Sequence, residues 1–262
     1  MSTPYPLVRN VIAASTRRRV FTSRFLTASS IFLFYIALFG GSASAQSVDA
    51  LYADRENLTS AKQVAVLLVE QGGREPESVD AAWRLARICY WLGGHAPEAE
   101  RRAYLERGVA AAQRAARLAP ERPEGHFWAA ANMGGLAEGY GLRAGMRYRK
   151  PIREALETVL RLDPAFMQGS ADRALGRYYA RVPSLLGGSR EKAERHLRAS
   201  LRYNPDSTIS RLFLAELMLD QKRTTEARVE LQRVIDAPLS DEWAPEDREF
   251  KRKAAALLAA SR

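Results

Sequence analysis

The sequence has 262 residues, of which 47% are hydrophobic, so it is long enough to build a sizeable core. The formal net charge is +10, but residues 1–45 contribute half of it through five arginines and contain no acidic residue. In the rest of the chain, acidic residues are interspersed with arginines along the predicted helices, which argues against a nucleic-acid-binding protein. The single cysteine, Cys89, excludes an internal disulfide and a metal site built from several cysteines.

The first 45 residues have the layout of a secretory signal peptide. Three arginines at 17–19 precede an apolar run at 31–39, and Ala43-Ser44-Ala45 then forms a small-x-small cleavage site. We expect cleavage between Ala45 and Gln46. The apolar run is shorter than the ~20 residues of a membrane-spanning helix, and an uncleaved inner-membrane anchor is the alternative. Arginine predominates over lysine, which suits a bacterium with a GC-rich genome, so the expected location is the periplasm.

The remaining residues, 46–262, predict an all-α domain, because alanine is abundant and strand-forming runs are scarce. Residues 171–179 contain the pattern Leu-Gly-x-x-Tyr, and Ala193, Leu197, Ser200 and Pro205 follow it. This is the pattern of a tetratricopeptide repeat (TPR): a small residue where two helices touch, an aromatic residue in the next gap, and a proline after the second helix. One such helix pair cannot bury its apolar face alone, so neighbouring pairs are expected.

In chain order, we predict a partial N-terminal pair, four full helix pairs and a C-terminal capping helix. Residues 47–71 form the partial pair, and residues 245–261 form the cap. The full pairs run from Trp83 to Pro120, from Phe127 to Pro164, from Asp172 to Pro205 and from Leu214 to Pro238. The predicted architecture is a TPR-like α-solenoid, or superhelical bundle, of roughly ten to eleven antiparallel helices.

Three consecutive pairs are longer than a standard repeat of about 34 residues. The extra residues lie between the two helices of each pair, at 93–97, 139–145 and 182–188, and they are rich in glycine. Glycine and proline at these places favour loops. Insertions at the same place in successive repeats map to one face, often the binding face, so we expect three loops along one edge of the stack.

The sequence contains none of the common catalytic, phosphate-binding or metal-binding motifs, so we predict a protein that is not an enzyme and uses no cofactor or metal. Binding is the better prediction. The first helix of each pair lines the concave side of a TPR stack. In the third full pair, the predicted inward positions are Arg173, Arg177 and Arg181, which steps of four place on one helix face. Three neighbouring guanidinium groups favour acidic partners or an anionic ligand.

The corresponding positions of the other pairs predict a concave surface of mixed character. They are Arg84, Ile88 and Leu92 with Trp91 adjacent, then Trp128, Asn132 and Leu136 with His126 nearby, then Leu212, Glu216 and Asp220. Such a surface would suit an amphipathic carboxylate or a peptide segment. The candidate binding residues are Trp91, His126, Trp128, Asn132, Arg173, Arg177 and Arg181. In the alternative interpretation, Glu216 and Asp220 pair with the arginines, and the tryptophans belong to the core.

Several segments resemble the T-component family associated with tripartite ATP-independent periplasmic (TRAP) transporters. They are residues 83–87, 125–132, 173–179 and 182–189, and the last contains the distinctive Pro-Ser-Leu-Leu-Gly-Gly run. A more distant similarity is to the mitochondrial regulator-of-microtubule-dynamics proteins. The T-component resemblance implies a periplasmic helical-repeat protein that holds a small apolar or amphipathic ligand and docks with a TRAP solute-binding protein. The chain lacks the lipid-accepting cysteine that we expect in many members of that family.

Two functions therefore remain open. The first is a ligand- and partner-binding accessory of periplasmic solute uptake, and the second is a general protein–protein interaction scaffold in the cell envelope. Either could form a homo-oligomer, and neither calls for nucleic acid. A narrowed cavity would favour the first function, whereas an open groove would favour the second.

Overall fold

The computed structural model describes residues 47–261, and these residues form helices and connecting turns without any strand. The all-α prediction is therefore confirmed. The predicted signal peptide and its cleavage site at Ala45 and Gln46 lie outside the described residues. Within the described part of the chain, the helices are either too short or too polar to cross a membrane.

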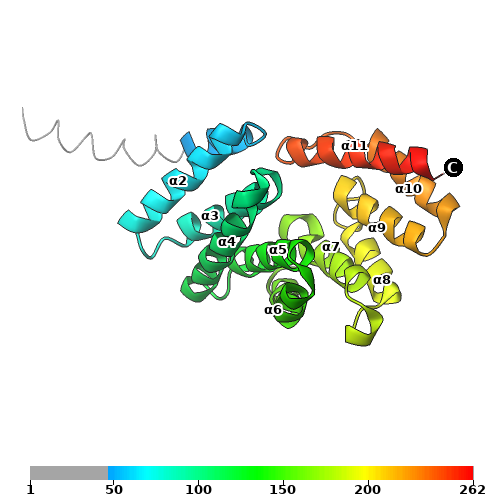
Figure 1. Ribbon diagram of the computed structural model, residues 1–262, viewed down its shortest axis with the longest axis horizontal. Coiled ribbons are helices and arrows are strands. Elements are labelled where there is room, and N and C mark those ends of the chain that lie inside the picture. Colours follow the sequence, from blue (N-terminus) through cyan, green and yellow to red (C-terminus); the bar gives the residue numbers. More distant parts are fainter. Residues whose placement is uncertain (1–46, 262) are drawn as a thin grey trace, which may run out of the picture. The chain divides into compact units, whose positions relative to one another are not determined.

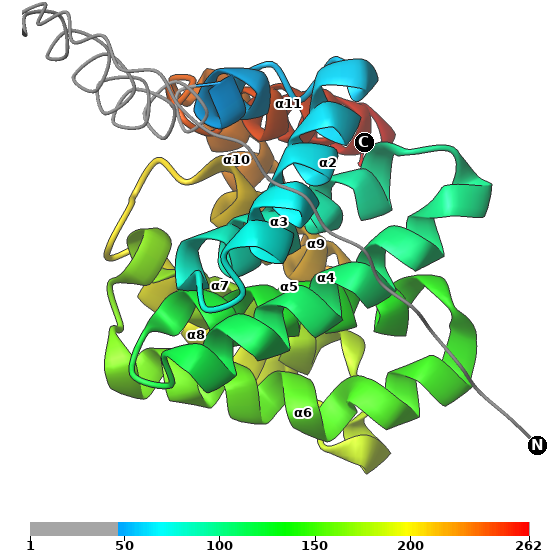
Figure 2. The same cartoon turned by 90° about the vertical axis from the view of Figure 1, so that its left-hand side faces the viewer.

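The described helices follow one another as a series of hairpins. Residues 47–53 are helical, and α2 (Leu58–Arg74) follows them. The pairs are α3 (Val79–His95) with α4 (Glu98–Leu118), α5 (Pro123–Gly139) with α6 (Gly141–Leu162), α7 (Phe166–Arg181) with α8 (Arg190–Ser200), and α9 (Thr208–Asp220) with α10 (Thr224–Asp236). The last helix, α11 (Ala244–Ala260), packs on α9 and α10. Figure 1 shows the pairs arranged in an arc, and Figure 2 shows the succession from α2 down to α6 in side view.

Local sequence signals explain where several of these helices begin. The side chains of Asn57, Ser78, Ser189 and Ser207 each accept a hydrogen bond from a backbone N–H in the first turn of α2, α3, α8 and α9, respectively. Such caps satisfy backbone donors that have no partner inside the helix. Helix α5 instead begins with Pro123, whose fixed φ suits the first helical position. These signals are local, so they can be read from the sequence.

The TPR pattern forms the contact between α7 and α8. A Cβ atom added to Gly176 would lie 2.5 Å from Leu197 Cγ, so only glycine allows this approach of the two helices. Leu175, Ala193 and Leu197 are buried beside it. They belong to a core that continues through α3 to α9. The match between this pattern and the contact explains why the repeat could be recognised from sequence.

The first two predicted loop insertions are instead helical, which corrects the sequence-based interpretation. Gly93 lies inside α3, and only Tyr140 separates α5 from α6. For the first insertion the physical reason is a close contact: Leu105 of α4 packs where the side chain of Gly93 would otherwise be, and it meets Gly135 of α5 in the same way. These glycines make room for a neighbouring helix, rather than breaking their own. Only the third insertion is a loop, which contains the short 3-10 helix η1 (Ser184–Leu186).

Side chains join the beginning of the described chain to α11. Arg55, which is 1% exposed, pairs with Glu246, and Arg248 pairs with Glu56. His95 Nε2 lies 3.2 Å from Glu249 Oε2. We call these three pairs the polar clasp. Its pairs link residues 154 to 192 positions apart, and the first and last described helices lie on the same side of the arc.

Candidate functional site

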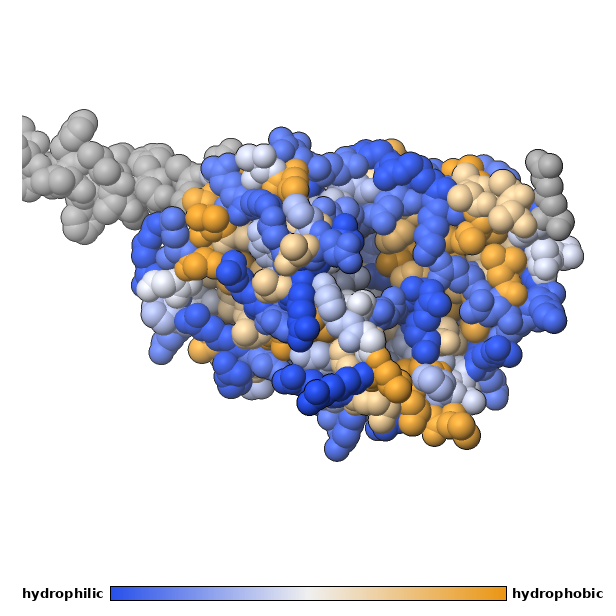
Figure 3. All heavy atoms as spheres, in the orientation of Figure 1, coloured by the Kyte–Doolittle hydropathy of each residue, from blue (hydrophilic) through white to orange (hydrophobic). Residues whose placement is uncertain are grey.

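The helices enclose a cavity of about 860 Å³, which is within the usual range for small-molecule sites. Its walls come mainly from α5, α6 and α7, with further residues from α3, α9 and α11. Figure 3 shows a hollow near the middle of one face, with hydrophilic and hydrophobic residues around it. The polar clasp contributes directly, because Glu246 is one of the lining residues.

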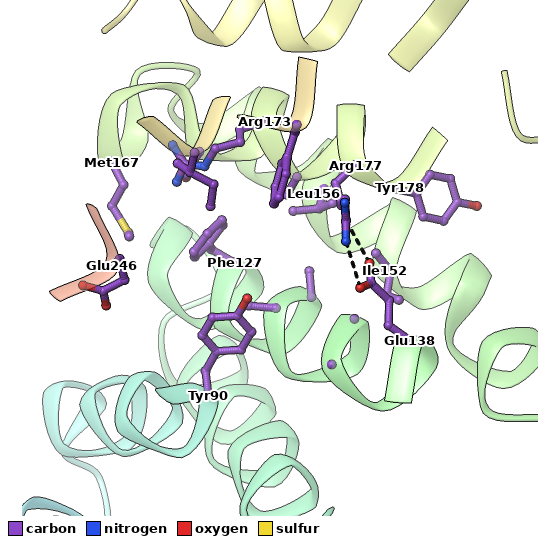
Figure 4. A pocket seen from close by; sticks show the side chains of 18 of the residues that line it. Tyr90, Phe127, Glu138, Ile152, Leu156, Met167, Arg173, Arg177, Tyr178 and Glu246 are labelled. Carbon is purple, nitrogen blue, oxygen red and sulfur yellow. Dashed lines mark hydrogen bonds and ion pairs between the residues drawn. The ribbon is translucent and has the colours of Figure 1, made fainter. Parts of the chain in front are cut away.

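Much of the cavity wall is aromatic or aliphatic. The Phe127 and Trp128 rings meet edge to face with 5.1 Å between their centroids, and the Tyr90 ring lies 5.9 Å from that of Trp128. Ile152 and Leu156 of α6 add an aliphatic wall. Such a surface favours the apolar part of a ligand, because its burial removes hydrocarbon from water. Figure 4 shows Tyr90 and Phe127 projecting into the same space below Arg173.

Two of the three α7 arginines are neutralised by acids of neighbouring helices. Arg177 Nε lies 3.1 Å from Glu138 Oε1, and Arg177 Nη1 lies 2.5 Å from Glu216 Oε2. Burial opposes the charge of Arg177, but the two carboxylates outweigh it and raise the arginine pKa. Arg181 lies 3.4 Å from Glu216, which Lys253 also contacts at 2.6 Å. The alternative interpretation is thus correct for Glu216.

Arg173 differs from both, because it has no hydrogen bond or ion pair with any described residue. Burial lowers the pKa of this arginine to about 10, and the nearby Tyr90 hydroxyl is the single ionisable group that opposes the shift. The side chain therefore remains positively charged at neutral pH. The side chain is only partly exposed, and a partly desolvated charge without a partner is energetically costly. Arg173 is consequently the cavity group that gains most from an incoming anion.

Tyr90 provides a second polar group close to Arg173. Tyr90 lines the cavity and is 44% exposed into it, and the surrounding protein atoms partly desolvate the hydroxyl, which raises its pKa. Among the described residues no hydrogen bond to its hydroxyl is found, so this O–H is available to donate to a ligand. The indole N–H of Trp128 is also buried without a partner in the same part of the chain. The cavity thus combines an apolar wall with a few unsatisfied donors.

A backbone segment with unusual dihedral angles positions two further lining residues. Met167, Gln168 and Gly169 at the start of α7 all have positive φ angles, of 44°, 57° and 75°. Non-glycine residues in this region are strained, and such strain is often found at functional sites. Met167 and Gln168 both line the cavity. The left-handed turn places the flexible Met167 side chain on the wall that faces Glu246 (Figure 4).

The structure brings together five of the seven candidate binding residues in the cavity wall: Trp91, Trp128, Arg173, Arg177 and Arg181. Trp91 is largely buried, and its indole N–H donates to the backbone carbonyl of Arg55 at 2.8 Å. His126 lies outside the cavity and bonds to the carbonyl of Pro120. Asn132 is also outside it: it is completely buried and donates to the carbonyls of Ala86 and Trp128.

All three expected inward positions line the cavity on α7, but on α5 only Trp128 does, and on α3 and α9 none does. On α3 the lining residues are Arg87, Tyr90 and Trp91, whereas Ile88 and Leu92 are completely buried in the core. On α9 they are Thr208, Ile209 and Phe213, rather than Leu212, Glu216 and Asp220. The rotation of each helix depends on the packing of its neighbours, so one register cannot be transferred along the stack. Tyr90 and Phe213 were missed for this reason.

Other chemical groups of the described chain do not form a second site. Residues 47–261 contain no cluster of three or more His, Cys, Asp or Glu side chains that could hold a metal ion. Cys89 is buried, and its burial raises the thiol pKa to about 12. A thiol with such a pKa is a poor nucleophile at neutral pH. The cavity is therefore the strongest candidate site in the described chain.

Comparisons with solved structures support the helical-repeat fold. TTC0263, a thermophilic TPR protein of Thermus thermophilus, is 20% identical with a TM-score of 0.63, and the alignment covers 82% of this chain and 99% of that chain. The MamA protein is 12% identical (TM-score 0.47, covering 81% and 96%), and YrrB, described as a TPR protein with an unusual peptide-binding site, is 15% identical (TM-score 0.43, covering 74% and 89%). The similarity to TTC0263 supports a common fold and nothing more specific. The curated proteins provided no match.

Two family models match different parts of the chain. The model for a tetratricopeptide repeat matches residues 185–260. The model named RMD1-3, regulator of microtubule dynamics protein 1-3, matches residues 45–186, which is more than half of the chain. It corresponds to the more distant of the two similarities noted in the sequence. The chain therefore belongs to the regulator of microtubule dynamics protein 1-3 family and continues into a tetratricopeptide repeat.

Proposed function

We propose that this protein is a non-catalytic binding protein whose cavity takes up a small amphipathic anion, such as a carboxylate with an apolar chain. The observation that carries the proposal is Arg173, a charged side chain without a partner among the described residues, above an aromatic wall. The apolar part of the ligand would contact Phe127 and Leu156. Its carboxylate would accept hydrogen bonds from the Arg173 guanidinium and the Tyr90 hydroxyl.

The energetics favour an anion over a neutral ligand. A hydrogen bond to a charged group contributes about 1.5–3 kcal/mol, because the alternative is a partly buried charge without a partner. The neighbouring Arg177 already has two carboxylates, so it adds little to binding. One anionic head group and one apolar body therefore match the cavity better than a polar or multiply charged ligand.

Calorimetric titration with dodecanoate and with uncharged dodecanol tests the proposal. We expect wild-type protein to prefer dodecanoate, and Arg173→Met to weaken dodecanoate binding by about 10- to 150-fold while leaving dodecanol binding almost unchanged. Arg181→Met is the matched control. It removes the same charge from the same helix, but its partner Glu216 keeps Arg177 and Lys253. Equal dodecanoate affinity in Arg173→Met and wild type would refute the proposal.

The cellular role that we propose is an accessory of solute uptake in the periplasm, with a TRAP solute-binding protein as the partner. The signal-peptide-like layout of residues 1–45 and the Pro-Ser-Leu-Leu-Gly-Gly run support this assignment. The test is affinity purification of the tagged full chain from a periplasmic extract. Enrichment of a TRAP solute-binding protein is the expected result. Recovery of envelope-assembly proteins alone would contradict it.

A scaffold in the cell envelope is the second candidate. The tetratricopeptide match over residues 185–260 supports it, since stacked repeats form extended binding surfaces. Native mass spectrometry of the purified protein separates the two functions. A bound small molecule that is lost in Arg173→Met supports ligand uptake. A protein complex that survives this substitution supports the scaffold.

A further inference from the structure

The first half of α6 packs less closely against the protein than the second half, although Tyr148 contacts the core. Residues 141–150 include no buried residue, whereas the second half of the helix buries Ile152, Leu156 and Val159. A helix of a globular protein normally buries one stripe along its whole length. We call residues 141–150 the α6 overhang. A segment of this length without a buried residue leaves exposed surface available for a partner.

The α6 overhang is strongly basic. It carries Arg143, Arg147, Arg149 and Lys150, and the chain contains no acidic residue from 139 to 153. Arg143 and Arg147 have no ion pair with any residue of the described chain, and Arg147 instead lies over the Tyr148 ring. Elsewhere in the protein, most helix arginines have acids close by, as Arg102 has Glu106. Much of the positive charge of the α6 overhang is therefore available to interact outside the molecule.

Exposed apolar side chains accompany this charge. Leu142 of the overhang is 77% exposed, and Leu185 at the tip of η1 is 98% exposed. Arg149 donates a hydrogen bond to the carbonyl of Leu186, which holds the η1 turn beside the overhang. Leu142, Met146 and Leu186 also line the cavity. The same surface thus has available cations, projecting leucines and access to the cavity.

We propose that the α6 overhang and Leu185 dock this end of the cavity onto an anionic membrane surface. Arginine and lysine attract anionic head groups, and exposed leucines enter the boundary between head groups and acyl chains. A leucine that projects almost fully exposed from the tip of a turn suits insertion into a bilayer. The fluid bilayer adapts to the side chain and needs no preformed pocket of matching shape. A protein partner would instead need a matching pocket for it. This proposal does not depend on the identity of the cavity ligand.

Co-sedimentation of the full chain with lipid vesicles tests this surface. We expect binding to vesicles of equal parts phosphatidylglycerol and phosphatidylcholine, no binding to pure phosphatidylcholine, and release by added salt. The double variant Arg143→Glu/Arg147→Glu should bind at least ~10-fold more weakly. Leu185→Ser should also weaken binding, although it changes no charge. Circular dichroism should show unchanged helix content in both, since the altered side chains are exposed.

The matched control is Arg195→Glu/Arg252→Glu, which changes the net charge equally at exposed sites on α8 and α11. It should bind the anionic vesicles within ~2-fold of wild type, because its arginines are not on the docking surface. Equal losses in the two double variants would overturn the proposal, as would unchanged binding by Arg143→Glu/Arg147→Glu. Binding of wild type to polyglutamate but not to the vesicles would indicate an acidic protein partner and would also overturn it. Arg173→Met should still bind the vesicles, which separates this surface from the cavity ligand.

Discussion

Replacing Glu246 by alanine should destabilise the protein by about 3 kcal/mol, because it leaves the buried Arg55 without its carboxylate. Arg55 Nε donates to Glu246 Oε1 at 3.1 Å, and the Arg55 Nη2 group also contacts this carboxylate. The guanidinium additionally donates to the backbone carbonyls of Tyr52 and Glu242. The carboxylate therefore supplies about half of the hydrogen bonds of a side chain that is almost fully buried.

The size of the effect follows from what remains after the substitution. Removal of one partner from a buried ion pair costs about 3–5 kcal/mol, because the other charge stays buried. The two carbonyls and the Tyr52 ring, whose centroid is 4.5 Å from the guanidinium carbon, still stabilise Arg55. We therefore expect the lower end of this range. For a domain of this size, it corresponds to a fall in Tm of about 6–12 °C.

Urea unfolding followed by circular dichroism measures the loss, and Glu56→Ala provides the control. Its partner is Arg248, and both side chains are nearly half exposed, so the loss should be at most about 1 kcal/mol. Both pairs join the start of the described chain to α11. The comparison therefore distinguishes the cost of an unpaired buried charge from the cost of losing a link between these two segments. Replacing Arg55 and Glu246 together by methionine should recover part of the loss. Similar losses in Glu246→Ala and Glu56→Ala would refute the reasoning.

Two further substitutions and one pH effect can be predicted. Gly108→Ala should cost about 1–3 kcal/mol in urea unfolding, because the new methyl group would collide with the fully buried Asn132. Gly73 of α2 has free space around it, so Gly73→Ala should instead stabilise the protein by up to about 1 kcal/mol. A similar loss of stability in both variants would show that the collision with Asn132 is not the cause. Burial opposes the charge of His95, but Glu249 and a backbone carbonyl outweigh it and raise the imidazole pKa above 6.5. The stabilisation is thus fully present below the unfolded pKa and is lost as pH rises through the folded pKa. The free energy of unfolding measured in urea should fall by less than about 1 kcal/mol between about pH 6 and 8. In Glu249→Gln most of this pH dependence should disappear, and its persistence would assign the effect to another group.

The sequence predicted the helices well because their signals are local. Pro120, Pro164 and Pro205 follow the second helix of three pairs, and Gly176 meets Leu197 as the repeat pattern requires. The glycine-rich segments misled the prediction for a non-local reason. Gly93 and Gly135 lie in different helices, and both face Leu105 of a third, so their role becomes visible only when the three helices pack together.

In the candidate site, too, the sequence predicted the local features, whereas tertiary packing determined the contacts. The sequence placed Arg173, Arg177 and Arg181 on one face of one helix, because a helix repeats its direction about every four residues. Which of them has a partner among the described residues depends on acids far along the chain: Glu138 and Glu216 are each 39 residues from Arg177. The rotation of α3 that brings Tyr90 towards Arg173 depends likewise on packing. By itself, then, the sequence determined the helices, their order and the repeat pattern. The tertiary structure decided the cavity, its closure by Arg55 and Glu246, and which cavity arginine the described chain leaves for a ligand, because these depend on contacts between segments distant in the chain.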